Sequence, residues 1–202
     1  MVNYIFAPPP TFGISEHPFT TWNDAFTFDE LRNIINYCDS IPKNKGSVGG
    51  SSENDDISNI RKSDIAWIDL NDTTKWIYDR LADVLRSING QFYRFDIYGF
   101  CENLQYTLYD GNYSGHYTWH QDSGVSHQFS SPRKLSLVLQ LSDSWEYEGG
   151  ELEIYSSLKP TQVKKQKGLI TVFPSYMLHR VTPVTAGIRR TLVVWVTGPA
   201  FR

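Results

Sequence analysis

The stretch Tyr117-Thr118-Trp119-His120-Gln121-Asp122 contains two residue types that bind metals. Its aromatic and β-branched residues predict a β-strand, in which successive side chains point to opposite faces. His120 and Asp122 are two positions apart, so they would project from one face. His179 follows in a second strand-like run, residues 173–181. Two imidazoles and one carboxylate form the facial ligand set of non-haem Fe(II), which leaves three coordination positions open.

Two arginines follow the second histidine. Arg189 and Arg190 stand at the head of the apolar run 191–196. A guanidinium can hold a carboxylate through two parallel hydrogen bonds, so an arginine here could bind an organic acid. Because side chains alternate along a strand, only one of the two is expected to point into the interior.

Several further segments have a familiar order along the chain. They are residues 104–109, the His120-x-Asp122 pair, residues 133–142, Gly149-Gly150-Glu151-Leu152 and the run from Phe173 to Arg202. Together with the histidines they resemble Fe(II)/2-oxoglutarate-dependent dioxygenases, in particular the prolyl 4-hydroxylase and PKHD-type branch. The matching segments cover about half of the chain and most of the residues after 100.

The resemblance implies roles for individual residues. It makes His120, Asp122 and His179 the Fe(II) ligands. Arg189, ten positions after the distal histidine, would bind the C5 carboxylate of 2-oxoglutarate, with Arg190 as an exposed edge residue. Residues expected near the co-substrate are Tyr109, Gln140, Thr191 and Trp195; residues expected near the substrate are Tyr117 and Arg61.

Some of these assignments have structural alternatives. Filling of an aromatic core accounts equally well for Tyr117 and Trp195, and it is also open for Tyr109. Gln140 stands where some prolyl hydroxylases have a tyrosine that assists the arginine, so the chain departs from the family at this position. The two glycines before Glu151 are expected to permit positive φ at a turn, which is a structural role.

The activity implied by the resemblance is hydroxylation of a peptidyl proline. Fe(II) and O₂ would be required, with ascorbate as a further reductant, and 2-oxoglutarate would be decarboxylated to succinate. The partner would be a peptide or protein substrate containing proline. One alternative is a 2-oxoglutarate oxygenase acting on a free amino acid or another side chain. Another is a non-catalytic metal-binding jelly roll of the cupin or lectin type.

Composition narrows the class of protein. A chain of 202 residues fits one domain, 1–202. The net charge of −3 and the absence of a basic stripe argue against nucleic acid as a partner. Cys38 and Cys101 are far apart and fit reduced thiols. No run approaches the roughly 20 apolar residues that span a bilayer, and no signal peptide is recognisable, so a cytoplasmic protein is expected. The oligomeric state is left open.

Periodicity predicts two early helices followed by strands. A capping box at Thr27 and Glu30 begins the first helix. The second begins at Asp72 or Thr73 and ends at Asn89-Gly90, with Gly90 as a left-handed stop. Helices packed on one sheet of a mainly β protein, with the resemblance above, predict a double-stranded β-helix (jelly roll). The expected strands are about 64–69, 92–98, 101–109, 115–121, 133–142, 150–155, 168–173, 178–183 and 189–197.

Residues 43–60 are rich in Gly, Ser and charge, with little apolar surface to bury. They predict a mobile loop. It would be either a plain surface loop or a lid that closes over a bound peptide.

Overall fold

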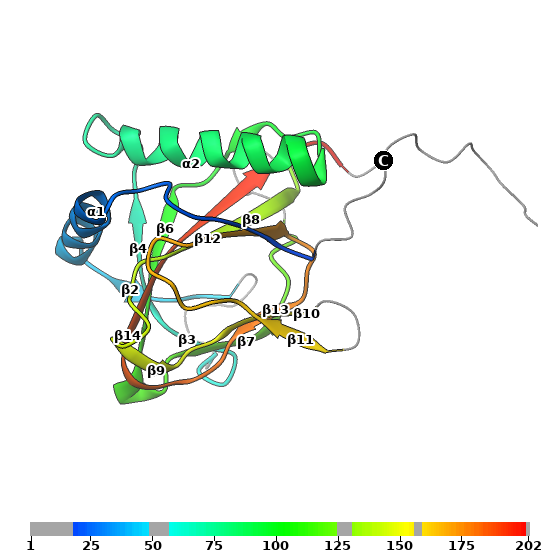
Figure 1. The fold of residues 1–202 in the computed structure, drawn as a ribbon. Helices are drawn as coiled ribbons and strands as arrows, with labels where there is room; N and C mark the ends of the chain where they lie inside the picture. The colour runs from blue at the N-terminus through cyan, green and yellow to red at the C-terminus, as the bar shows by residue number, and fades with distance from the viewer. Residues whose placement is uncertain (1–17, 49–56, 125–130, 156–158, 201–202) are drawn as a thin grey trace, which may run out of the picture.

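The computed structural model describes residues 18–48, 57–124, 131–155 and 159–200. They form two antiparallel sheets that face each other, with two helices outside the larger sheet (Figure 1). The larger sheet has the order β1 (Thr20–Trp22), β12 (Ile170–Pro174), β8 (Arg133–Gln140), β14 (Val184–Thr197), β6 (Leu104–Asp110), β4 (Asp64–Ile68) and β2 (Asn44–Lys45). Two short strands, β5 (Gly99–Phe100) and β9 (Tyr147–Gly149), also pair with β14.

The smaller sheet has the order β11 (Pro160–Gln162), β10 (Leu152–Tyr155), β13 (His179–Val181), β7 (His116–His120) and β3 (Arg61–Lys62). The predicted double-stranded β-helix is therefore confirmed. Seven of the predicted strands overlap β4, β6, β7, β8, β10, β12 and β13, and the last predicted strand lies within β14.

The helices form the outer layer of the larger sheet. α1 (Phe28–Ser40) begins with the predicted capping box: the Glu30 amide donates to Thr27 Oγ1 at 3.2 Å, and the Thr27 amide donates to Glu30 Oε2 at 2.8 Å. α2 is Lys75–Ile88. The apolar faces of both helices join the sheet in one core, whose fully buried members include Ile34, Leu81, Leu104, Leu137 and Leu192. This layer holds β6, β8 and β14 rigidly from outside.

The end of α2 corrects two predictions. The helix runs on through a π-helical turn, Asn89–Tyr93, and the left-handed residue is Arg94 (φ 54°), not Gly90. The predicted strand 92–98 is absent from this described segment. Instead, the Asn89 side chain bonds both backbone groups of Phe95, at 2.9 and 3.0 Å, and ties the chain back to the turn. The aromatic residues that suggested a strand pack against the core from this irregular segment.

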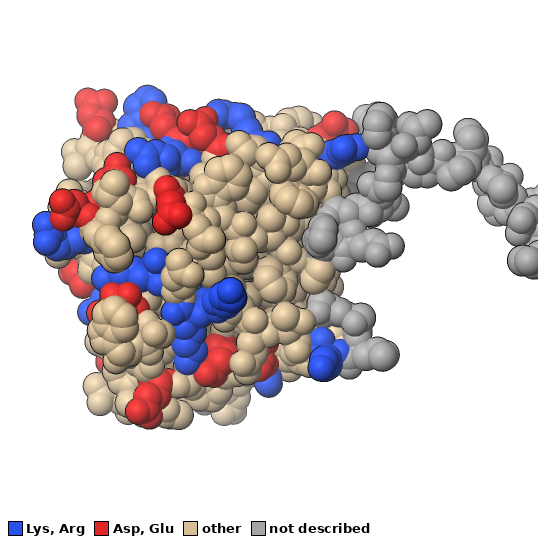
Figure 2. Space-filling model, in the orientation of Figure 1, with Lys and Arg blue, Asp and Glu red and all other residues tan. Residues whose placement is uncertain are grey.

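Part of the predicted mobile loop is ordered by pairing. β2 pairs with β4, and the Gly46 amide donates to the Ser63 carbonyl at 2.7 Å. Residues 49–56 lie outside the described residues, so the mobility of that stretch stays a prediction. Neither described helix is long and apolar enough to cross a membrane. Figure 2 shows Lys, Arg, Asp and Glu mixed along the helical layer, where Lys75 pairs with Asp79 and Arg86 with Asp83.

Candidate metal centre

Strand pairing brings the two predicted histidine ligands together. His120 on β7 and His179 on β13 are direct cross-strand partners, and their ring centroids are 4.1 Å apart. Asp122 follows β7, and its amide donates to the Ser175 carbonyl at 2.8 Å. His120 Nε2 lies 3.6 Å from Asp122 Oδ1, and His179 Nε2 lies 3.5 Å from Oδ2. One potential ligand atom from each of the three residues lies within 4.8 Å of the others, which is a geometry that could hold one metal ion.

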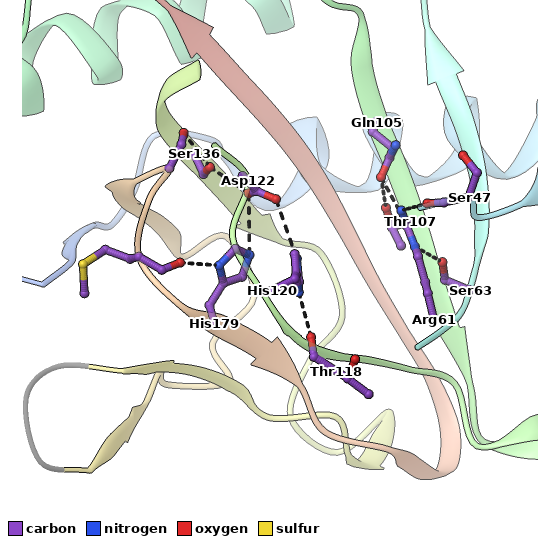
Figure 3. A network of polar contacts seen from close by, with 12 residues as sticks. Ser47, Arg61, Ser63, Gln105, Thr107, Thr118, His120, Asp122, Ser136 and His179 are labelled. Atoms are coloured by element: carbon purple, nitrogen blue, oxygen red, sulfur yellow. Dashed lines mark hydrogen bonds and ion pairs between the residues drawn. The ribbon is translucent and has the colours of Figure 1, made fainter. Parts of the chain in front are cut away.

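Backbone carbonyls determine the tautomer of both rings (Figure 3). Nδ1 of His120 lies 2.7 Å from the Thr118 carbonyl, and Nδ1 of His179 lies 2.9 Å from the Met177 carbonyl. A carbonyl oxygen only accepts, so each Nδ1 carries the proton and donates it. The lone pairs of both Nε2 atoms are therefore free and point toward Asp122, as metal binding requires.

The third ligand is kept ionised. Burial alone would raise the pKa of Asp122, but His179, His120 and the Ser136 hydroxyl together hold that pKa below its usual value. Ser136 Oγ donates to Asp122 Oδ2 at 2.7 Å and lies 3.0 Å from Ser175 Oγ. Both serines are fully buried. A buried carboxylate beside two imidazoles is a donor set suited to a divalent cation.

The first histidine is kept neutral. Burial is the largest cause that lowers the pKa of His120 to about 4; the neighbouring His179 and Arg61 act in the same direction, and Asp122 opposes them. The Tyr117 ring stacks on the imidazole, with centroids 3.4 Å apart. His120 pairs with His179, and Tyr117 pairs with Val181. Between these two pairs the chain advances three positions along β7 but only two along β13, so β7 contains a bulge. This bulge brings Tyr117 onto the same side as His120.

A cavity of about 710 Å³ opens in front of the three ligands, between the two sheets. Alternate residues of β14 and β6 supply much of its wall, as strand periodicity requires. The predicted site residues that line it are His120, Asp122, His179, Arg189, Tyr109, Thr191, Trp195, Tyr117 and Arg61.

The two arginines lie on opposite sides of β14. Arg189 is 3% exposed and lines the cavity, where its guanidinium carbon is 5.6 Å from the Tyr109 ring centroid. Among the described residues, no Asp or Glu forms an ion pair with it. The prediction that Arg190 is an exposed edge residue is wrong, because β14 lies between β8 and β6 and the Arg190 side chain is partly buried. Arg190 faces the helical layer, with Nε 3.4 Å from Asp39 Oδ2. The interior position thus belongs to Arg189.

Gln140 is not brought into this cavity. It lies behind Arg189, beside a small void lined also by Tyr147. Its Nε2 donates to the Ser142 carbonyl at 3.0 Å and to the Tyr147 hydroxyl at 3.1 Å. These bonds occupy the amide nitrogen. Gln140 is the cross-strand partner of Thr191, but only Thr191 lines the cavity. Tyr147, which the sequence did not indicate, lines the same small void as Arg189.

The cavity mouth is built from residues that the sequence analysis did not select. Arg133 bonds Glu102 through Nε and Nη2, at 2.7 and 2.5 Å, and lies over the Trp195 ring at 3.9 Å. Trp67, which is 41% exposed, lies beside Trp195. The Trp195 Nε1 is buried without a hydrogen-bond partner among the described residues.

One sequence signal could have found other missed residues. In the buried strand β6, Gln105, Thr107 and Tyr109 place polar groups at every second position between apolar residues. Such alternation within a buried strand indicates a polar cavity on one face.

Comparison with known proteins agrees with this geometry. Residues 104–197 match the family model described as the 2OG-Fe(II) oxygenase superfamily. This segment, which holds all three candidate ligands and Arg189 and makes up a little under half of the chain, is similar to that superfamily.

The curated relatives are PKHD-type hydroxylases. The chain is 42% identical over 82 residues to one from Synechococcus sp., covering 41% of this chain and 36% of the relative. It is 48% identical over 62 residues to one from Hyphomonas neptunium, covering 31% and 28%. The matches thus span about a third of the relatives' length. The family resemblance predicted from the sequence is confirmed.

Solved structures share the fold over a longer range. A Pseudomonas putida prolyl-4-hydroxylase superposes with a TM-score of 0.70 at 21% identity, covering 91% of this chain and 94% of that one. A Trichoplax adhaerens prolyl hydroxylase, solved with a hypoxia inducible factor peptide fragment, gives 0.71 at 20% identity, covering 90% and 84%.

Proposed function

We propose that this protein is an Fe(II)- and 2-oxoglutarate-dependent dioxygenase that hydroxylates a peptidyl proline and forms succinate from 2-oxoglutarate. The observation that carries the proposal is that one cavity contains both a set of metal ligands and a buried arginine without an acidic partner among the described residues. The ligands are His120, Asp122 and His179, and the arginine is Arg189.

The residues present fit both groups. His120, Asp122 and His179 would hold Fe(II), because each offers a free nitrogen or oxygen lone pair to the cavity. Arg189 would bind the far carboxylate of 2-oxoglutarate, since a buried guanidinium needs an anion. Thr191 and Tyr109 line the cavity beside it and would offer hydroxyl groups to the same acid. When bound, the metal and the oxo acid supply the activation of O₂.

The chain's own contribution is orientation and exclusion of water. Val138, Leu152 and Val193 give the cavity apolar wall, which would help to exclude water from the reacting groups. Trp67 and the Arg133–Glu102 pair line the mouth, where a substrate side chain would enter. The prolyl part of the proposal is supported by the fold shared with two prolyl hydroxylases.

The test has two stages. An anaerobic titration with Fe(II) and then 2-oxoglutarate should produce metal-to-ligand charge-transfer absorption, and the Asp122→Ala protein should not produce it. O₂ is then admitted with a panel of proline-containing peptides, and succinate and peptide mass are measured. Succinate formation coupled to a gain of one oxygen atom on proline supports the proposal. If oxygen is gained only on other residues or on free amino acids, the protein is an oxygenase but not a prolyl hydroxylase. If the charge-transfer band is absent from the unaltered protein, the oxygenase assignment itself is overturned.

A further inference from the structure

A second polar corner of the cavity lies away from the metal ligands, around Arg61 at the start of β3 (Figure 3). Arg61 is 8% exposed. Its Nε donates to Ser63 Oγ at 2.8 Å, Nη1 to the Ser47 carbonyl at 3.0 Å and Nη2 to Gln105 Oε1 at 3.0 Å. All three acceptors are neutral. Among the described residues, no carboxylate forms an ion pair with this guanidinium.

The guanidinium is clamped in place. A Cβ atom at Gly46 would come within 2.7 Å of Arg61 Nε and 2.4 Å of Ser63 Oγ, so glycine backbone packs directly on this side chain. On another side the guanidinium carbon lies 4.8 Å from the Tyr117 ring centroid. An arginine held by contacts of this kind loses little freedom when it binds a ligand, which favours a binding role.

The corner offers hydrogen-bond donors to the cavity. Gln105 Oε1 accepts from Arg61 and also from Thr107 Oγ1, at 3.3 Å. This pattern assigns the orientation of the amide, so Gln105 Nε2 points the other way. Within the described part of the chain Nε2 has no hydrogen-bond partner, and it is not sealed from solvent. A guanidinium carries five N–H groups, and the three hydrogen bonds above use three of them, so Arg61 has further N–H groups that can donate to a ligand. A matching ligand group must accept hydrogen bonds.

The net charge of the cavity indicates which kind of hydrogen-bond acceptor would bind beside Arg61. Of the residues that the structure describes, the charged ones that line the cavity are Arg61, Arg133, Arg189, Glu102 and Asp122. Arg133 and Glu102 neutralise each other. In the proposed function, a divalent metal and a dianionic oxo acid balance Asp122 and Arg189. Among the described residues, nothing compensates the buried positive charge of Arg61, which is costly unless a ligand supplies the anion.

We infer that Arg61 and Gln105 bind a carboxylate of the primary substrate, so the substrate is a prolyl peptide with a carboxylate next to the proline. This inference rests on the proposed function. Arg61 stacks on Tyr117, which in turn stacks on the ligand His120, so the carboxylate site adjoins the reacting centre. The carboxylate comes either from an Asp or Glu side chain or from the C-terminus of the peptide, since both present the same acceptor atoms.

The experiment measures binding of matched peptides by anaerobic calorimetry to protein loaded with Fe(II) and 2-oxoglutarate. The acidic probes are acetyl-Asp-Pro-Ala-amide, acetyl-Ala-Pro-Asp-amide and acetyl-Ala-Pro with a free C-terminus. The neutral partners carry Asn in place of Asp, or a C-terminal amide. At least one acidic probe should bind at least about tenfold more tightly than its partner, as expected for a charge-assisted bond. Which pair shows the difference distinguishes a side-chain carboxylate from a terminal one.

Variants of Arg61 test whether the preference for acidic peptides comes from the site formed by Arg61 and Gln105. Arg61→Gln should abolish the difference between partners, and Arg61→Lys should restore part of it. Lys62→Gln is the matched control, because Lys62 is the next residue of β3 but does not line the cavity. The comparison of peptide partners on the unaltered protein needs no variant, so it stands even if Arg61→Gln fails to fold.

The outcomes separate the two proposals. Equal affinity for acidic and neutral partners in every pair, or no binding by any acidic probe, overturns the carboxylate site. If neutral and acidic peptides are nonetheless hydroxylated equally, the proposed function stands without it. A clear acidic preference with no oxygen gain on proline after O₂ is admitted supports the site and overturns prolyl hydroxylation.

Discussion

Two buried guanidiniums face one cavity, and their surroundings give them different tasks. Arg189 lies beside Tyr109 and Thr191, deep in the wall formed by β14 and β6. Arg61 lies across the Tyr117 ring from His120. Neither has an acidic partner among the described residues, so each is assigned an anion from outside the chain. The variants of these arginines are therefore the most informative single changes.

Arg189→Lys should weaken 2-oxoglutarate binding at least about tenfold, because lysine keeps the charge but loses the planar fork that grips a carboxylate. Fe(II) affinity should stay unchanged. Arg190→Lys, on the opposite side of β14 near Asp39, should alter neither. Both affinities can be measured by anaerobic titration. A larger effect from Arg190 than from Arg189 would show that the wrong arginine has been assigned to the acid.

His120 makes the stability of the metal-free protein depend on pH. Its pKa is about 4 in the folded protein and 6.5 when unperturbed. As the pH falls below 6.5, the unfolded chain binds the proton first, so the folded state loses stability between pH 6.5 and about 4. The loss is on the order of 2–3 kcal/mol. Urea unfolding at pH 7 and pH 4.5 should show this loss, and His120→Gln should remove it.

The control for this prediction is His116→Gln, on the same strand but outside the cavity. It should leave the pH dependence of the unfolding free energy intact. An identical loss of stability in His120→Gln and unaltered protein would mean that other groups cause the acid sensitivity.

At the scale of the elements, the turn at Gly149 and Gly150 joins β9 to β10 and packs against Arg189. Gly149 and Gly150 have φ of 69° and 64°, as the sequence predicted for a positive-φ turn. A Cβ atom on Gly149 would lie 2.2 Å from the Pro183 carbonyl oxygen, and one on Gly150 would lie 3.2 Å from Arg189 Cδ. The two glycines thus allow close approach of backbone to backbone behind Arg189.

Gly149→Ala should therefore lower the free energy of unfolding by roughly 2–4 kcal/mol, from the left-handed backbone and the contact with Pro183. Gly90→Ala is a matched control, because a Cβ there meets nothing within 4 Å and the residue lies in the π-helical turn. It should raise stability by about 0.5–1 kcal/mol. Chemical denaturation of both variants tests the pair. Equal effects of the same sign would contradict the assigned role of the turn.

On the scale of the molecule, ligands of the site connect the two sheets. The histidines belong to β7 and β13 of the smaller sheet, whereas Arg189 belongs to β14 of the larger one. A metal alone engages the first group, and 2-oxoglutarate would bridge both. Ligand binding to the folded state should then stabilise the whole fold by mass action.

Mn(II), which replaces Fe(II) without turnover, should raise Tm, and 2-oxoglutarate should add a second increment only when Mn(II) is present. At a hundred times the dissociation constant, each increment is about 5–10 °C. Arg189→Lys should lose about half of the second increment or more, because tenfold weaker binding leaves only about ten times the dissociation constant, and it should keep the first. Thermal unfolding followed by circular dichroism measures both. A 2-oxoglutarate increment of unchanged size in Arg189→Lys would place the acid elsewhere.

Local pattern was enough for several features of this protein. Residue type and spacing along the chain marked His120, Asp122 and His179, because metal ligands are chemically few and strand periodicity puts i and i+2 on one face. The capping box of α1 and the glycine turn were also predictable, because each depends on atoms within a few residues. The same holds for the choice of a mainly β fold with two early helices.

Contacts between distant segments decided the rest. The bulge that turns Tyr117 toward His120 depends on the register of β7 against β13, and Gln140 is drawn away by Tyr147. The π-helical turn after α2 replaced a predicted strand because Asn89 bonds Phe95 and the aromatic residues reach the core. The environment of Arg61 joins Gly46, Ser63 and Gln105 from three strands or loops. No single stretch of sequence contains these pairings, so only the tertiary structure determines which donors remain free to bind a ligand.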